Sequence, residues 1–341
     1  MSHESTDELD KAWQLLEGGD TAGARKLADR LAPAVGDDGK ADLLLLQAAC
    51  AREEGQNDEA LSLLQQAAVA DPEWVTPELW TAELLMSDPG RVGEALGHAT
   101  RALDLADEED EYLEALAVKA SIEIDLGKLA DARKTLGELP AADEVQLDPV
   151  WALEIGYLLL AVEDAAEARR RFQALADADP ELSDAWYGAG LAAEAQDDET
   201  GKRDAWMRVL KLDERRPLDE PLLSEAEMAG VAEAALGELP PRARKLVQNV
   251  PILITDLPAR SDVAEGLDPR LLGLFAGTPH PEASSLGTGA QLTQILLFRK
   301  NLERVAGDAD ELRDEIRTTL LHETGHFFGM SEDDLEAVGL E

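Results

Sequence analysis

A repeat with a period of about 36 residues constrains the fold of this chain more than any other feature of its sequence. Four Gly residues that are each followed five residues later by an Ala recur at intervals of 36, 35 and 37 residues. The four anchors are Gly19 with Ala24, Gly55 with Ala60, Gly90 with Ala95, and Gly127 with Ala132. The spacing continues without the Gly at Glu163 with Ala168 and at Thr200 with Ala205. Such a period indicates an array in which each unit buries its apolar face against its neighbours.

Each unit carries the marks of two closely packed helices. Seven residues before the anchor the side chain is small in every unit except the third, so two helices can approach each other there. These small residues are Ala12, Ala48, Ala120, Gly156 and Ala193. Seventeen residues after the anchor, a Pro at positions 72, 180 and 217 would end the second helix of three units. Apolar residues between these marks recur at spacings of three and four, which predicts one apolar stripe per helix.

These residues resemble the tetratricopeptide repeat (TPR), a pair of antiparallel helices with a small residue at the close contact and an Ala in the second helix. The resemblance implies an all-α TPR-like solenoid of about six helix pairs over residues 1–216. It also implies that a protein or peptide binds to the concave face. Stacking alone would require the same small residues, so a solenoid without a ligand groove is the alternative.

The charge and cysteine content limit the classes of partner and of metal site. With 72 acidic and 31 basic residues, the formal net charge of −41 repels nucleic-acid phosphates and anionic membranes, so we expect neither as a partner. A partner of this surface would be basic, although acidic residues also serve simply to solvate a protein. Cys50 is the single cysteine, which excludes an intrachain disulfide and a thiolate zinc site. Without a basic and apolar leader at the N-terminus, we expect a cytoplasmic protein.

Aromatic residues divide the chain into two parts. All six Trp and all three Tyr precede residue 207, whereas four of the five Phe follow residue 270. Between these parts, Pro217 and Pro221 lie in a charged segment with the character of a connector. We therefore predict a second domain over residues 217–341.

This second domain contains the sequence His322-Glu323-Thr324-Gly325-His326. Asp308 and Glu311 can form a capping box at the start of a helix over residues 309–328, with Leu312, Ile316, Leu320 and Phe327 as its apolar stripe. A helix puts the two His side chains on one face, where neutral imidazoles can hold Zn²⁺. Glu323, next to the first His, would accept a proton from the metal-bound water. The pattern predicts a metal-dependent hydrolase, although two His and a carboxylate can also hold Fe²⁺.

The third metal ligand has to be local or to lie upstream, because only 15 residues follow His326. Gly329 can reverse the chain, and Glu332 then lies ten residues after His322, the position of the third ligand in His-Glu-x-x-His-x-x-Gly-x-x-His/Asp sites. We predict Glu332 as this ligand, with Asp333 in reserve. Asp334 and Glu336 are weaker alternatives.

Three segments of the second domain resemble the minimal zincin-like metallopeptidase family of bacteria. They are Asn249-Val250-Pro251, Leu272 through Gly277, and His322 through Asp333. The family usually has Asp where Glu332 stands here. The resemblance implies a small α+β domain in which strands near 252–256 and 291–299 accompany the zinc helix, with a Gly-rich loop over 271–279. By the same resemblance, the strand that contains Leu292, Gln294, Leu296 and Phe298 would border the substrate cleft, where an extended peptide could add to its edge; plain core packing is the alternative for this strand.

The sequence thus predicts a multidomain protein, a TPR-like solenoid followed by a zincin-like domain. We expect a zinc-dependent peptidase in which Glu323 is the general base and the repeats recruit or position a protein. The competing hypothesis is a non-catalytic binding protein or adaptor that carries a vestigial or structural zinc domain.

Overall fold

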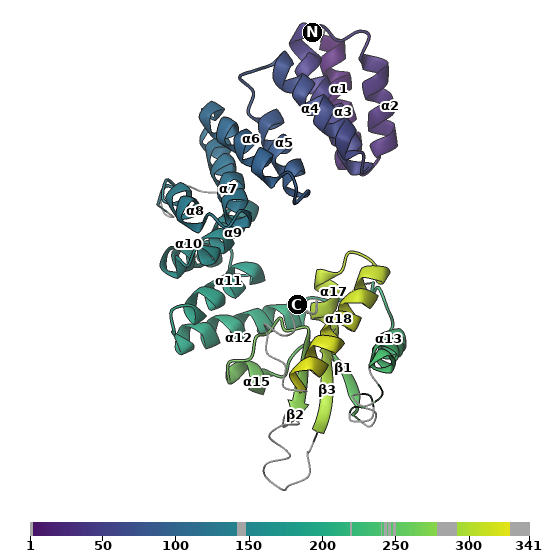
Figure 1. Cartoon of the computed structure of the whole chain (residues 1–341), viewed down its shortest axis with the longest axis vertical. Helices are drawn as coiled ribbons and strands as arrows, with labels where there is room; N and C mark the ends of the chain where they lie inside the picture. The colour runs from purple at the N-terminus through teal and green to yellow at the C-terminus, as the bar shows by residue number, and fades with distance from the viewer. Residues whose placement is uncertain are drawn as a thin grey trace. The chain divides into compact units, whose positions relative to one another are not determined.

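The chain forms two compact units in a computed structural model, unit 1 over Met1–Leu175 and unit 2 over Ala176–Glu341 (Figure 1). The structure describes residues 3–141, 148–218, 220–239, 241, 244, 247, 250–277 and 292–327; for residues 3–6, 275–277, 292–293 and 326–327 it describes the backbone alone. The division between the units precedes the limit at residue 216 that composition predicts. The last helix pair of the predicted solenoid therefore belongs by its contacts to unit 2.

The predicted helix pairs are present, five of them in unit 1 and the sixth at the start of unit 2. The pairs are α1 (His3–Glu17) with α2 (Thr21–Leu31), α3 (Lys40–Glu53) with α4 (Asn57–Ala70), α5 (Thr76–Met86) with α6 (Val92–Leu105), α7 (Glu109–Asp125) with α8 (Leu129–Leu136), α9 (Pro149–Ala161) with α10 (Ala165–Ala178), and α11 (Ser183–Glu194) with α12 (Glu199–Arg215). A single 3₁₀ turn, η1 (Asp37–Gly39), precedes α3 in the described part of the array. This order confirms the TPR-like architecture.

The repeat anchors lie in the turns between paired helices. Gly19, Gly55 and Gly127 adopt φ angles of 81°, 71° and 69°, the left-handed region that a Gly enters without a steric cost. Glu163 takes the same conformation in the fifth pair, with a φ of 62°. In the sixth pair the left-handed residue is Asp197, not the predicted anchor three residues later, because α12 already begins at Glu199. The turn of the sixth pair therefore lies three residues before the predicted anchor, Thr200.

Small residues lie where paired helices come closest. A Cβ atom on Gly156 would lie 2.5 Å from the ring of Phe172, which is buried in the partner helix α10. Gly190 of α11 meets the indole of Trp206 on α12 in the same way. The first of these contacts was predicted from the repeat spacing, and it shows that the paired helices approach too closely for a larger side chain.

Unit 2 continues with a three-stranded sheet and further helices. They are α13 (Glu225–Glu238), β1 (Ile252–Thr255), α15 (Arg260–Ala264), β2 (Gly273–Gly277), β3 (Leu292–Phe298), α17 (Arg299–Val305) and α18 (Ala309–Phe327). The strand order is β1-β3-β2, with β1 parallel and β2 antiparallel to β3. The strands near 252–256 and 291–299 were predicted. The loop predicted over 271–279 is wrong, because residues 273–277 form β2 and pair with β3.

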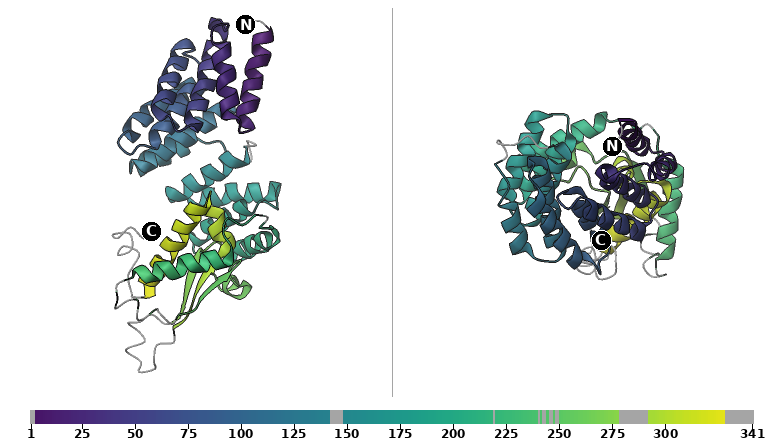
Figure 2. Two further views of the ribbon diagram at one scale, coloured as in Figure 1. Left: turned by 90° about the vertical axis from the view of Figure 1, so that its right-hand side faces the viewer. Right: turned by 90° about the horizontal axis from the view of Figure 1, so that it is seen from above.

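The core of unit 2 lies between the sheet and two helices, α13 and α18 (Figures 1 and 2). Ile295 and Leu297 alternate on β3 and point into this core, as a half-buried strand requires. Leu312, Ile316 and Leu320 supply the apolar stripe of α18 and are fully buried. The predicted stripe is thus confirmed at these three residues.

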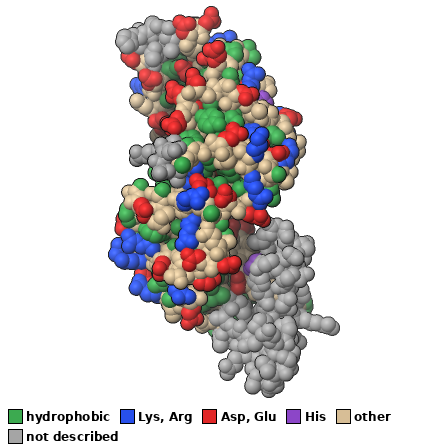
Figure 3. Space-filling model, turned by 90° about the vertical axis from the view of Figure 1, so that its left-hand side faces the viewer, with side chains coloured by type: hydrophobic (Ala, Val, Ile, Leu, Met, Phe, Trp, Pro, Cys, Tyr) green, Lys and Arg blue, Asp and Glu red, His purple; other side chains and the backbone are tan. Residues whose placement is uncertain are grey.

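The surface carries many acidic side chains. On the face shown in Figure 3 they are scattered over the described helices, and Lys and Arg side chains gather in groups between them. No helix in the described part of the chain is long and apolar enough to span a membrane.

Candidate metal centre

The helix that carries the His-Glu-x-x-His sequence begins at the predicted cap, Asp308, but the reciprocal hydrogen bond of the predicted capping box goes to Gly307 and not to Asp308. The Asp308 carboxylate accepts hydrogen bonds from the backbone N–H groups of Glu311 and Asp310, at 2.9 and 2.8 Å. These two hydrogen bonds hold the pKa of Asp308 below its usual range. The Glu311 carboxylate in turn accepts a hydrogen bond from Gly307 N–H at 2.7 Å. The predicted start of the helix is therefore confirmed, and it fixes the register of everything that follows on α18.

Three buried leucine and isoleucine side chains then set the rotation of α18 about its axis. Because the face with Leu320 is turned into the core, His322 lies at the edge of this face and is half-buried. Glu323 is 9% exposed, and Thr324 is buried with its hydroxyl donating to the backbone oxygen of Leu320 at 2.7 Å. A buried carboxylate thus follows a half-buried imidazole in the sequence of α18.

His326 also belongs to α18, four residues after His322, so both residues lie on the same side of the helix. The predicted third ligand, Glu332, and its reserve, Asp333, lie outside the described residues. Within the residues that the structure describes, no three His, Cys, Asp or Glu side chains are grouped to hold a metal ion. The predicted ligand set is therefore neither confirmed nor excluded, and it stays a prediction.

The donor chemistry on α18 fits a zinc ion. Two imidazoles one helical turn apart can bind the same ion from a rigid support, and the carboxylate of Glu323 is too close in sequence to His322 to share its direction. The carboxylate of Glu323 is largely shielded from solvent. His322 and His326 would hold the ion, with a third ligand from outside the described residues.

The predicted addition of a peptide to the edge of β3 is wrong, whereas the prediction that this strand borders a substrate cleft stays a prediction. β3 is the central strand of the sheet, and both of its edges are hydrogen-bonded, to β1 along Ile295–Phe298 and to β2 along Leu292–Leu297. A peptide cannot add to an edge that is already paired. Phe298 is 1% exposed, so this side chain is part of the core. Gln294 and Leu296 are half-buried, and the side chain of Leu292 is not described.

The strand next to the candidate centre is β2. A Cβ atom on Gly273 would lie 2.7 Å from Cγ2 of Thr319 on α18 and 3.2 Å from the backbone oxygen of Leu296. Only a Gly allows this approach, which brings β2 against α18 one helical turn before His322. Along the described residues, β2 pairs only with β3, so its outer edge is not hydrogen-bonded to another strand. Sequence reasoning missed this position because the glycines of 273–277 resembled those of a loop.

Comparisons with known proteins give separate matches for the C-terminal part and for the helical part of the chain. Residues 247–340 match the family of zincin-like metallopeptidases. No curated protein sequence matches this chain.

Among solved structures, the chain is similar to PilW, a widely conserved type IV pilus biogenesis factor, with a TM-score of 0.51 and 17% identity over 64% of this chain and 97% of PilW. PilF of Pseudomonas aeruginosa gives a TM-score of 0.49 and 16% identity over 62% of this chain and 93% of PilF. YrrB, a TPR protein with an unusual peptide-binding site, gives 0.40 and 17% identity over 52% of this chain and 89% of YrrB. The likeness to PilW supports the TPR-like fold of the helical region.

Proposed function

We propose that this chain, which joins TPR-like helix pairs to a zincin-like metallopeptidase domain, is a zinc-dependent peptidase. The observation that carries the proposal is the placement of His322, Glu323 and His326 on one well-anchored helix within the matched family domain. An inactive adaptor that binds zinc would contain the same helix. Replacement of the buried Glu323 carboxylate therefore distinguishes the peptidase from the adaptor in an experiment.

In this proposal His322 and His326 orient the metal, together with Glu332 or Asp333. Bound there, Zn²⁺ would polarise the scissile carbonyl and lower the pKa of a water molecule. Glu323 accepts a proton from the attacking water and returns it to the amine of the departing product. Burial of this carboxylate keeps bulk solvent from exchanging the proton during the reaction.

We further propose that the helical repeats recruit or position a protein, and that this partner is basic. The net charge of −41 supports a cationic partner. In unit 1, burial raises the pKa of Glu83 although Arg52 lies 3.7 Å away and acts against this rise, and burial together with the negative charges of Glu83 and Glu111 raises the pKa of Glu114. A lysine or arginine of a partner would relieve this repulsion. A lone, buried Cys50 thiol also suits the cytoplasmic location that we propose.

The test compares wild-type protein with Glu323→Ala in a proteome-wide cleavage assay with zinc present. We expect the variant to retain zinc by elemental analysis and to lose cleavage by about 10²–10⁴-fold, the usual contribution of a general base. Asp314→Ala, an exposed carboxylate on the same helix, is the matched control and should cleave like the wild type. His322→Ala should lose zinc as well as cleavage.

Two results would contradict the peptidase. A wild-type protein that binds zinc but cleaves nothing in the proteome would favour the adaptor. A Glu323→Ala protein that cleaves at the wild-type rate would remove the proposed base.

A further inference from the structure

The sixth helix pair, α11 with α12, is built into unit 2 although its sequence follows the repeat pattern. Trp206 and Leu210 of α12 are buried against Val263 of α15, and Leu257 packs beside them. These contacts bring an apolar face of the helix pair onto the segment that links β1 to β2. The pair therefore shares a core with the residues that lead into the sheet.

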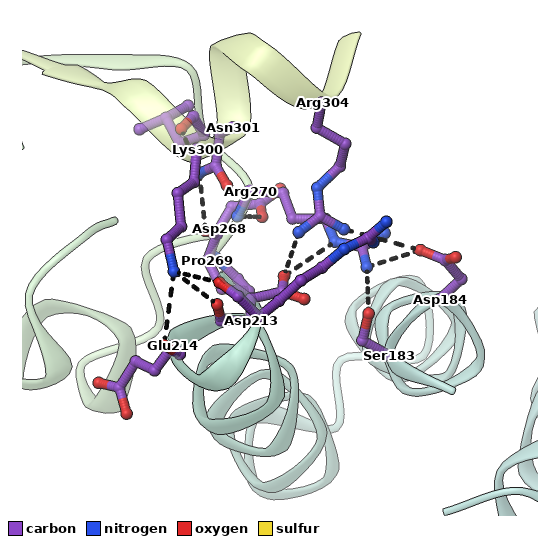
Figure 4. A network of polar contacts seen from close by, with 12 residues as sticks. Ser183, Asp184, Asp213, Glu214, Asp268, Pro269, Arg270, Lys300, Asn301 and Arg304 are labelled. Carbon is purple, nitrogen blue, oxygen red and sulfur yellow. Dashed lines mark hydrogen bonds and ion pairs between the residues drawn. The ribbon is translucent and has the colours of Figure 1, made fainter. Parts of the chain in front are cut away.

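An ionic cluster with the buried Asp213 at its centre joins the same elements (Figure 4). The side chain of Arg270, which is 11% exposed, lies 2.6 Å from Asp184 and donates to the hydroxyl of Ser183 at 3.0 Å. Its guanidinium also stacks over the ring of Tyr187, 4.5 Å from the centroid. One arginine thus holds three side chains of α11, and its planar group suits this combination of charge and stacking.

Asp213, near the end of α12, occupies the middle of the cluster. Its carboxylate is 3% exposed and lies 2.7 Å from Arg304 of α17 and 3.6 Å from Arg270. A carboxylate at this depth requires such partners, because an unpaired buried charge is strongly destabilising. Asp213 therefore links α12 to α17 as well as to the loop that carries Arg270.

Lys300 of α17 caps the C-terminus of α12. Its ammonium donates to the backbone oxygens of Asp213, Glu214 and Arg216, at 3.1, 3.4 and 2.6 Å. These are the carbonyl groups that a helix leaves without partners at its end, and a cation there also complements the helix dipole. The end of α12 is thus satisfied by a residue of the zincin-like domain.

The loop over residues 268–271 is held from both sides. Tyr187 of α11 donates its hydroxyl to Asp268 at 2.8 Å. From the other side, the buried amide of Asn301 donates to the backbone oxygens of Pro269 and Leu271, at 2.9 and 2.8 Å. Two residues later, Gly273 begins β2 and meets Thr319 of α18.

From these contacts we infer that the helix pair α11–α12 holds the loop over residues 268–271 in place. Through this loop and β2, Arg270 couples the helix pair to α18, the helix that carries His322 and His326. A change in the last helix pair is therefore passed to the candidate centre. The coupling stands on the contacts of unit 2, and its consequence for catalysis rests on the proposed function.

Hydrogen exchange of the full-length, metal-free protein tests this coupling. Arg270→Ala should raise exchange in residues 268–277 and 319–327 by about tenfold or more, because hydrogen bonds to charged groups are lost. Tyr187→Phe removes one hydroxyl and should raise exchange in the same segments about threefold, so the test survives if the first variant fails to fold. The control is Arg260→Ala, which breaks an ion pair with Glu214 at the same helix end, where both side chains are exposed. It should change exchange by less than about twofold.

The coupling is refuted if both junction variants leave residues 319–327 unchanged, or if α13 exchanges faster to the same extent as β2 and α18. The second result would mean a loss of global stability without a specific path. Limited proteolysis of the full chain gives an independent measurement. The protease-resistant C-terminal fragment should begin before Ser183, so that it includes α11 and α12. A stable fragment that begins within residues 216–222 would overturn the inference. Neither experiment needs a cleavage assay, so this inference and the proposed function can fail separately.

Discussion

A single methyl group should have opposite effects at two helical glycines of unit 1, Gly156 and Gly97. Replacing Gly by Ala inside a helix gains about 1 kcal/mol of helix propensity. At Gly97 of α6, which is exposed, a Cβ atom would meet nothing within 4 Å, so the gain should appear in full. At Gly156 the Cβ atom would lie 2.5 Å from the Phe172 ring, which is 0% exposed and cannot swing aside.

Overpacking of this kind costs about 1–3 kcal/mol. After the gain in helix propensity, Gly156→Ala should lower the free energy of unfolding by up to about 2 kcal/mol, whereas Gly97→Ala should raise it by up to about 1 kcal/mol. The difference between the two variants isolates the packing cost, since the propensity gain is common to both.

Urea unfolding followed by circular dichroism measures both variants against the wild type at one protein concentration. The unfolding midpoints should move in opposite directions while the slopes stay equal. If Gly156→Ala proves as stable as Gly97→Ala, the repeat position does not limit how closely α9 and α10 approach, and the reason given for its small residues is refuted.

Two predictions concern pH. Asp308→Ala should lower the melting temperature of the metal-free protein at neutral pH. Because the pKa of Asp308 is lowered in the native protein, the difference in melting temperature from wild type should shrink as acid protonates this carboxylate. A difference that stays constant down to about pH 2 would contradict the capping role. Burial raises the pKa of the Cys50 thiol to about 11, so the unfolded chain loses this proton before the native protein does, and stability should fall between about pH 9 and 11 by on the order of 2 kcal/mol. Cys50→Ala should lose this part of the alkaline decline, and equal declines for both proteins in denaturation at several pH values would show that the thiol does not contribute.

The helical part of the fold could be predicted because its signals are local and repeat. A turn residue with a positive φ angle recurs in five of the six described pairs, and a small residue before the turn recurs in five of the six units, so each unit supports the prediction for the next. The turn of the sixth pair was predicted three residues too late, because Asp197 takes the left-handed conformation that a Gly takes in other pairs. Asp tolerates this conformation, but an Asp in a sequence does not by itself indicate a turn.

The candidate centre could be predicted only as far as its helix. The cap at Asp308 and the buried stripe of α18 follow from spacing along one helix, and both are confirmed. Sheet order does not follow from spacing: nothing near Leu296 distinguishes a central strand from an edge strand, because both bury alternate residues. Arg270 and Asp213 gave no signal either, since their partnership depends on residues far apart in sequence.

The two units differ in how far along the chain their contacts reach, and this should order their folding. Unit 1 joins mostly successive helices, so each step closes only a short loop. Unit 2 must pair Tyr187 with Asp268, 81 residues apart, and β1 with β3, between which α15 and β2 lie along the chain. During synthesis the apolar side of α12 therefore stays uncovered until Val263 and the strands have left the ribosome, and this interval is when the nascent chain is most exposed to aggregation.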